Sequence, residues 1–266
     1  MKNATTLLFA AVCLTTTSFA AAITYGAGDN SDLYTINPAT GVTTLVGAMG
    51  VNLFDIAAYG GKLYGINATS DLYSISTLTG AATEIGATGQ SFNALTFSSA
   101  GVLYAAGTDT TDLYTINTST GAAAKVSGEV TQAAYHSGGD LEFIGTTLYL
   151  VTQTNGNSIL DTVNIGTGAL TKVGNSNLGT DNVYGLSYSG GVLYGFSDND
   201  GSSKVISINL ATGAGSNVAS YGGVGRSAFG FNGTTDSSTV PEPGTMGIIG
   251  LGLVGLGTIA RRRRKA

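Results

Sequence analysis

Leu33 to Gly41 reads LYTINPATG, and it is the first of five related stretches in this 266-residue chain. The stretch returns as LYSISTLTG at 72–80 and LYTINTSTG at 113–121, then in weaker form as LDTVNIGTG at 160–168 and VISINLATG at 205–213. The closing glycines are 39, 41, 47 and 45 residues apart. A period of about 40 residues indicates a repeat architecture.

Each copy predicts a strand followed by a hairpin turn. Apolar and polar residues alternate before the turn, which is the period of a strand and not of a helix. In the first copy Pro38 fixes φ for a turn position, and Gly41 adopts a left-handed conformation at no steric cost. The Asn-x-x-Thr-Gly joint therefore predicts a tight connection to a further strand.

Two more columns of residues recur with the same period. Tyrosines follow a Thr or Leu at the start of a second strand, and aromatic residues close another strand. The tyrosines are Tyr25, Tyr64, Tyr104, Tyr149 and Tyr194, and the aromatic column is Tyr59, Phe97, Phe143, Tyr188 and Phe231. Each unit then contains four strands, and four-stranded units of this length predict a β-propeller whose aromatic side chains fill the gaps between blades.

The number of copies predicts five blades. The chain enters its first unit at the tyrosine strand, Ile23 to Gly26, and ends on an unmatched aromatic strand at 228–233. One end supplies what the other lacks, so we expect an all-β, five-bladed ring in which 228–233 pairs with 23–26. An open β-solenoid is the alternative, but it would leave sheet edges exposed. The units loosely resemble bacterial exported propeller-like repeats over residues 23–233, a likeness that implies fold and not activity.

The N-terminus has the features of a secretory signal peptide at 1–20. Lys2 supplies a cation, residues 7–14 are largely apolar, and Ser18 and Ala20 are the small residues that signal peptidase requires. The propeller domain is then expected at 21–233. Cys13 is the only cysteine, so the chain after residue 20 has no disulfide although it is exported.

The C-terminus predicts a linker at 234–245 and a membrane helix with a basic tail at 246–266. The linker contains Pro241, Glu242 and Pro243, and the apolar run from Met246 to Ala260 is followed by five cations: Arg261, Arg262, Arg263, Arg264 and Lys265. As a helix the run is about 22 Å long, short of the roughly 30 Å of a bilayer core. The cations favour a helix whose C-terminal end stays on the cytoplasmic side, so that the propeller domain lies outside the inner membrane.

This tail resembles the PEP-CTERM sorting signal of exported Gram-negative proteins, over residues 240–266. The resemblance rests on Val-Pro-Glu-Pro, a short glycine-rich span and a terminal arginine cluster. It implies cleavage near the motif by an exosortase-type membrane peptidase, after transient anchoring, and release to the cell surface or extracellular matrix, often together with exopolysaccharide. The alternative is an ordinary single-pass anchor.

Charge and composition restrict the chemistry. Residues 21–240 carry five Lys and Arg against fifteen Asp and Glu, which argues against a nucleic-acid partner. His136 is the only histidine, so a zinc site of the usual kind is not expected, and no cofactor is predicted. Asp198 and Asp200 in DNDGS resemble the start of a calcium loop, although the downstream Glu is missing. A polar turn explains the same residues.

Paired carboxylates raise the question of catalysis. We expect the aromatic-ended strand to line the channel, and its polar residues are Asp55, Asn93, Asp140, Glu142 and Arg226. Two such acids could serve a glycosidase. Divergence among repeats produces the same pattern, so no catalytic residue is assigned. The favoured hypothesis is a non-enzymatic surface or matrix protein associated with polysaccharide; the alternatives are a lectin-like propeller and a glycan-cleaving enzyme.

Overall fold

The computed structural model describes residues 23–107, 112–126, 136–154, 157–175, 177–179, 182–199, 202–222 and 232–236. The predicted signal peptide at 1–20 and the predicted membrane helix at 246–266 lie outside these ranges. Within them the structure holds no helix long and apolar enough to cross a membrane. The described residues belong to one compact unit, Ala22–Ser238.

The described chain folds into five four-stranded sheets, each of which is one blade. The innermost strands are β4 (Leu53–Tyr59), β8 (Ala94–Phe97), β12 (His136–Ile144), β16 (Val183–Ser189) and β20 (Asn232–Asp236). The second strands, which carry the tyrosine column, are β1 (Ile23–Ala27), β5 (Lys62–Asn67), β9 (Leu103–Ala106), β13 (Thr147–Thr154) and β17 (Val192–Asn199). Blades are numbered 1 to 5 in the order of these second strands, so that blade 1 contains β20 and β1 and blade 2 contains β4 and β5. The expectation that the aromatic-ended strand is innermost is confirmed in blades 2 to 5.

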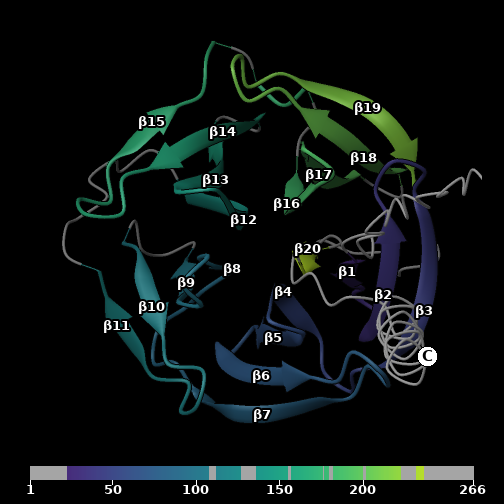
Figure 1. Cartoon of the computed structure of the whole chain (residues 1–266), viewed down its shortest axis with the longest axis vertical. Helices are drawn as coiled ribbons and strands as arrows, with labels where there is room; N and C mark the ends of the chain where they lie inside the picture. The colour runs from purple at the N-terminus through teal and green to yellow at the C-terminus, as the bar shows by residue number, and fades with distance from the viewer. Residues whose placement is uncertain are drawn as a thin grey trace, which may run out of the picture. The chain divides into compact units, whose positions relative to one another are not determined.

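The outer half of each blade contains the repeat that opened the sequence analysis. The third strands are β2 (Asp32–Asn37), β6 (Asp71–Ile75), β10 (Tyr114–Ile116), β14 (Asn157–Val163) and β18 (Ser202–Ile208). The outermost strands are β3 (Val42–Ala48), β7 (Ala82–Ala87), β11 (Ala123–Lys125), β15 (Leu170–Lys172) and β19 (Gly215–Ser220). Figure 1 shows the outermost strands around the rim and the innermost strands about the centre.

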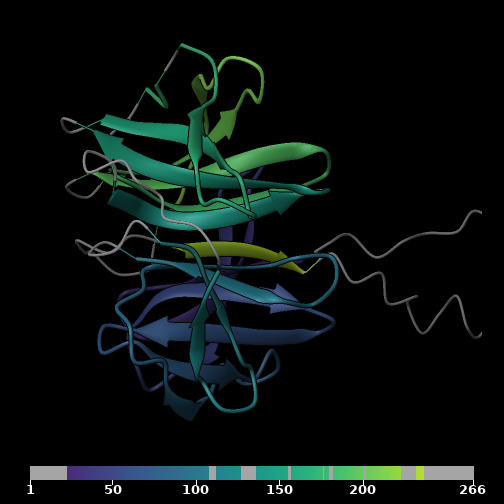
Figure 2. The same cartoon turned by 90° about the vertical axis from the view of Figure 1, so that its left-hand side faces the viewer.

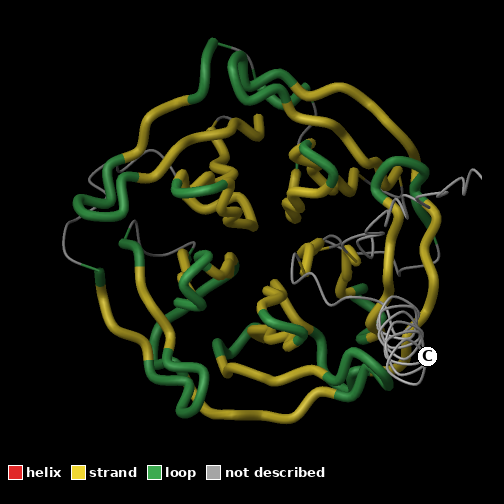
Figure 3. Tube along the Cα trace, viewed as in Figure 1, coloured by secondary structure: helices red, strands yellow, loops and turns green. Residues whose placement is uncertain are grey.

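The blades form a closed ring and not an open stack. Neighbouring strands within each blade are antiparallel, and the innermost strands contact one another in the cyclic order β4, β8, β12, β16, β20 and back to β4. Figure 3 shows strands and loops around the whole ring in the described part of the chain. The predicted five-bladed β-propeller is confirmed, and the β-solenoid alternative is wrong.

The last strand closes the ring by completing blade 1. β20 pairs antiparallel with β1, with Ile23 opposite Asp236 and Ala27 opposite Asn232. The predicted exchange between the two ends of the chain is therefore confirmed. Its register differs from the prediction, because the closing strand is 232–236 and not 228–233, and residues 223–231 lie outside the described residues.

The aromatic column is aligned as predicted in three blades only. Phe97, Phe143 and Tyr188 each lie opposite the leucine that directly precedes the tyrosine of the second strand. In blade 2 Ala58 takes that position, opposite Leu63, and Tyr59 follows it. The turn after Tyr59 has two residues, as in blades 4 and 5, so the shift arises because Tyr59 lies one residue nearer to its turn than the aromatic residues of those blades.

The hydrophobic core lies between blades. Each of the five buried clusters combines side chains of two neighbouring blades. The leucines that precede the tyrosines are almost completely buried; they are Leu63, Leu103, Leu148 and Leu193. Burial of apolar surface therefore stabilises the contacts between blades as well as the blades themselves.

The Thr-Gly turns bring neighbouring blades into backbone contact. Gly41, Gly80 and Gly121 have φ values of +72°, +78° and +81°. A Cβ built on any of them would lie less than 3.0 Å from a backbone oxygen of the preceding blade; these oxygens belong to Ser220, Gly47 and Gly86. A glycine is needed here both for the left-handed conformation and for the close approach.

We expect Gly80→Ala to destabilise the propeller more than Gly89→Ala. Gly89 has nearly the same φ, +75°, but a Cβ there would meet nothing within 4 Å. Both variants bear the left-handed strain, about 1 kcal/mol. Only Gly80→Ala adds a steric conflict with the neighbouring blade, a further ~1–3 kcal/mol. Urea denaturation of the two variants measures the difference, and equal midpoints would contradict the backbone contact.

We expect removal of β20 to unfold the whole ring. A chain ending at residue 231 leaves the edge of β1 unpaired, and it removes the contacts of β20 with β4 and β16. An unpaired inner edge also promotes association between molecules. The measurement is a melting curve of residues 21–231 against 21–238. A shorter chain that stays monomeric and melts at the same temperature would show that closure does not stabilise the ring.

Candidate functional site

Three carboxyl groups gather on the innermost strands. Asp55 comes from β4 in blade 2, and Asp140 and Glu142 come from β12 in blade 4. Asp55 and Asp140 are buried, with 0% and 1% of their surface exposed, whereas Glu142 is partly buried. The sequence predicted all three as channel residues. Of the two other predicted channel residues, Asn93 precedes β8, and Arg226 lies outside the described residues.

Asp55 and Asp140 hold neighbouring blades together in the same way. The Asp55 carboxylate accepts hydrogen bonds from the backbone N–H of Ile56 at 2.8 Å and from that of Leu95, in the next blade, at 2.5 Å. Asp140 accepts from Leu141 at 2.6 Å and from Leu186 in the next blade. Each aspartate therefore satisfies two buried backbone donors, one on either side of a blade boundary.

The two aspartates also contact each other, although they belong to blades 2 and 4. Their side chains share a hydrogen bond, which requires a proton on one of them. Burial raises the pKa of Asp55 well above its ordinary value, and its backbone hydrogen bonds offset part of the rise. Burial, followed by the charge of Asp55, raises the pKa of Asp140. Two carboxylates this close repel each other, which favours the state in which one of them keeps its proton.

Glu142 extends the cluster toward two further blades. Its carboxylate accepts a hydrogen bond from the backbone N–H of Tyr188 at 3.0 Å and another from the Thr96 hydroxyl. Burial raises the pKa of Glu142 from its ordinary value of 4.5 to about 8, against the lowering effect of these donors. The cluster thus connects blades 2, 3, 4 and 5 around the channel.

The geometry of the aspartate pair differs from that of a glycosidase. The two carboxyl groups of a glycosidase flank the scissile bond, roughly 5–9.5 Å apart. Asp55 and Asp140 are in direct hydrogen-bond contact, and both are used by backbone donors. Because neither presents a free carboxylate to a substrate, what the arrangement can do chemically is hold blades together.

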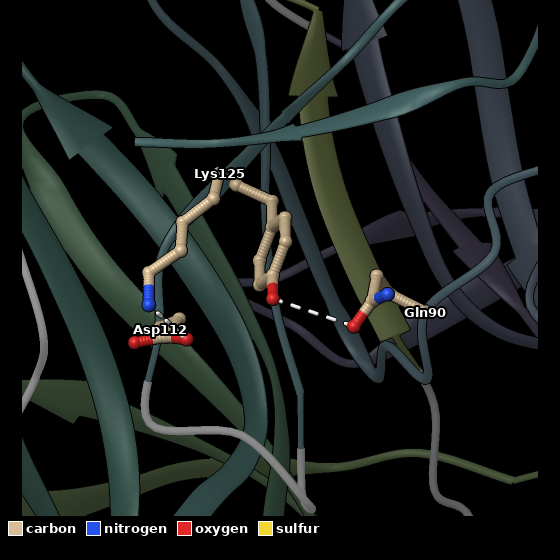
Figure 4. A network of polar contacts seen from close by, with 4 residues as sticks. Gln90, Asp112 and Lys125 are labelled. Atoms are coloured by element: carbon tan, nitrogen blue, oxygen red, sulfur yellow. Dashed lines mark hydrogen bonds and ion pairs between the residues drawn. The ribbon is translucent and has the colours of Figure 1, made fainter. Parts of the chain in front are cut away.

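A second polar network lies on the outer half of blade 3. Lys125 on β11 forms an ion pair with Asp112 at 2.7 Å, and Tyr114 donates a hydrogen bond to Gln90 at 3.3 Å (Figure 4). Blades 1 and 2 carry related networks, in which an asparagine donates to both the Asp and the Tyr of the Asp-Leu-Tyr stretch. The pairs are Asn30 with Asp32 and Tyr34, and Asn67 with Asp71 and Tyr73. These polar groups satisfy one another within the blade.

Most of the other predicted site residues have side chains outside the described part of the chain. Asp198 belongs to β17, opposite Ser203, but its side chain and the whole of Asp200 fall outside the described residues. The calcium prediction therefore stays a prediction. Among the described residues no group of three or more His, Cys, Asp or Glu could hold a metal ion. His136 begins β12, and its side chain is likewise not described.

The predicted sorting residues also lie outside the described ranges. This applies to the motif residues Pro241, Glu242 and Pro243 and to the basic residues Arg261, Arg262, Arg263, Arg264 and Lys265. The three channel carboxyl groups are therefore the candidate site whose hydrogen bonds and burial the structure shows.

We expect the free energy of unfolding to fall as the pH rises from about 4.5 to about 8. The folded chain holds the Glu142 proton in this range and the unfolded chain releases it. The fall is up to about 1.4 kcal/mol per pH unit for one proton. Below 4.5 both states bind the proton, and above 8 neither does, so this group adds no slope there.

Glu142→Gln should make this fall shallower, because the amide cannot titrate. Glu84→Gln on β7, where the side chain is exposed, is the matched control and should keep the wild-type slope. Urea denaturation at several pH values between 4.5 and 8 measures both. If the unfolding free energy of Glu142→Gln fell with pH as steeply as that of the wild type, Glu142 would not be the group that causes the fall.

Comparison with known proteins gives a family and a fold. Residues 86–235 match the family described as "Repeat of unknown function (DUF6923)", and residues 239–265 match the PEP-CTERM protein-sorting motif. No match is found among the curated proteins.

Solved structures resemble the chain at low sequence identity. The crystal structure of a nidogen/laminin complex has a TM-score of 0.50 at 14% identity, covering 82% of this chain and 86% of that one. A Bacteroides caccae protein of unknown function has a TM-score of 0.46 at 11% identity, and the match covers 82% of this chain and 100% of that one. Myxococcus xanthus glutaminyl cyclase has a TM-score of 0.43 at 17% identity, and the match covers 64% of this chain and 71% of that one. At such identities the likeness concerns the fold alone.

The family match spans more than half of the chain and falls within the propeller, and the sorting motif directly follows it. The chain therefore belongs to the family described as "Repeat of unknown function (DUF6923)", and it ends in a PEP-CTERM protein-sorting motif.

Proposed function

We propose that this chain is a non-enzymatic surface protein that displays a rigid propeller outside the cell after sorting through its C-terminal tail. The observation that carries the proposal is the PEP-CTERM match at 239–265, which begins three residues after the strand that closes the ring. The sorting motif marks the chain for export. Because β20 ends at Asp236, cleavage at the motif would leave every described strand of the propeller intact.

The tail would hold the chain transiently in the inner membrane. Met246 to Ala260 supplies a short apolar span, and the five cations that follow it favour the cytoplasmic side. An exosortase-type peptidase would then cut near Pro241-Glu242-Pro243, after signal peptidase has removed residues 1–20. The product would be released to the cell surface or the extracellular matrix.

The channel chemistry supports a structural rather than a catalytic role for the propeller. Asp55 and Asp140 bind backbone donors of neighbouring blades and each other. Association with exopolysaccharide follows from the resemblance of the tail to sorting signals that accompany polysaccharide export. A ring of backbone-linked blades without disulfides suits a matrix component that must stay folded outside the cell.

We expect the exported protein to lack Arg261 to Lys265. Intact-mass measurement of material outside the cells decides this, because cleavage near the motif removes the apolar run and the cations together. A double Pro241→Ala and Pro243→Ala variant should stay in the membrane fraction at its full anchored mass. Ser238→Ala, just before the motif, is the matched control and should be processed normally. An extracellular protein that retains the arginine cluster would overturn the processing and leave a plain anchor.

A further inference from the structure

Both ends of the described propeller lie at the same face of the ring. Ile23, where β1 begins, is paired with Asp236, where β20 ends. In the other blades the equivalent position is the turn between the innermost and the second strand, at 60–61, 98–102, 145–146 and 190–191. We call the surface formed by these turns and the two ends the tail-side face. Figure 2 views the ring from its edge, with β20 running across it.

The tail-side face carries exposed apolar side chains in three consecutive blades. Ile23, Tyr59 and Val102 are 49%, 41% and 40% exposed. Tyr59 is stacked on Phe97 of the next blade, with ring centroids 5.4 Å apart, and its hydroxyl donates to the Ser99 carbonyl at 3.4 Å. The tyrosine is therefore held in place at the surface, and it does not rotate freely in solvent.

The tail-side face is less acidic than the domain as a whole. Lys62, which begins β5, is exposed beside Tyr59, the four turns contain no Asp or Glu, and Asp236 ends β20 at this face. Acidic residues lie at the other ends of the strands, in or after the loops between second and third strands. Those whose side chains are described are Asp29, Asp32, Asp71 and Asp112. The domain thus has an acidic face and a face that is nearly neutral and partly apolar.

The distance between the propeller and the predicted membrane segment is short. Nine residues, 237–245, separate Asp236 from Met246. Even a fully extended chain of this length spans only about 30 Å. The anchored precursor therefore keeps the tail-side face near the bilayer, at a high effective concentration. Anionic headgroups repel the acidic face more strongly than the tail-side face, where the charges of Lys62 and Asp236 offset each other.

We propose that, in the anchored precursor, the tail-side face rests on the phospholipid surface through Ile23, Tyr59, Val102 and Lys62. This inference rests on the anchor of the proposed function. Tyrosine is favoured at the membrane interface, where its ring is buried and its hydroxyl stays hydrated. The acidic face then points away from the membrane, toward whatever the exported protein meets. Cleavage of the tail ends the contact, because three apolar side chains and one lysine bind lipid weakly without an anchor.

A pair of single-cysteine spin labels tests the orientation. The chain from residue 21 onward has no cysteine, so an introduced one is unique. Ser99→Cys places a label on the tail-side face. Gln90→Cys places the matched label on the opposite side, beside the Ser70 loop that Thr88 contacts through a 2.8 Å hydrogen bond. Residues 21–266 are reconstituted into vesicles of phosphatidylcholine and phosphatidylglycerol.

We expect the Ser99 label to lose collisions with a water-soluble nickel chelate on reconstitution and the Gln90 label to keep them. Tyr59→Ser with Val102→Thr should restore the collisions at Ser99. Flotation of the vesicles separates the two hypotheses. A chain that does not float lacks the proposed anchor. A chain that floats with equal exposure of both labels, or with both shielded, keeps the anchor but overturns the orientation.

Discussion

The close backbone approach between neighbouring blades is the constraint on which this propeller depends. At three blade boundaries a left-handed glycine after a threonine lies so close to a carbonyl oxygen of the preceding blade that no side chain fits. This explains the glycine in those three repeats, and Gly168 and Gly213 share its left-handed conformation. At the same three boundaries the close approach brings the blades near enough to share an apolar cluster. The core of this domain is a set of five interfaces, and a single blade has no core of its own.

The sequence predicted the elements and the closure because both are encoded locally. Alternation marks the strands, Asn-x-x-Thr-Gly marks a turn, and the unmatched ends reveal the exchange between β1 and β20. The register of β20 could not be predicted, because the aromatic residue does not keep a fixed distance from the turn, as the shift of Tyr59 shows. The channel was predicted only in part. Asp55 and Asp140 were expected to line it, but their hydrogen bond joins blades 2 and 4, which no spacing along the chain reveals.

The carboxyl cluster and the sorting tail give this protein two separate kinds of chemistry. Acids in the channel bind backbone N–H groups across blade boundaries. Such buried groups stabilise the ring only while every donor and acceptor is matched. The last described strand ends at Asp236, and the sorting motif begins at residue 239. The strands of the ring and the sorting motif therefore occupy separate stretches of the sequence.

Closure by the final strand also sets the order of events during biosynthesis. Domains that emerge from the N-terminus can fold as they appear, but here β1 waits for a partner that lies more than 200 residues later in the chain. Until residues 232–236 have crossed the membrane, blade 1 is a three-stranded sheet with an open inner edge. The apolar run begins ten residues after Asp236. In the proposed anchored precursor, translocation would halt just as the missing strand arrives, so that the ring would be completed while the protein is tethered and separated from other copies with which its open edge could pair.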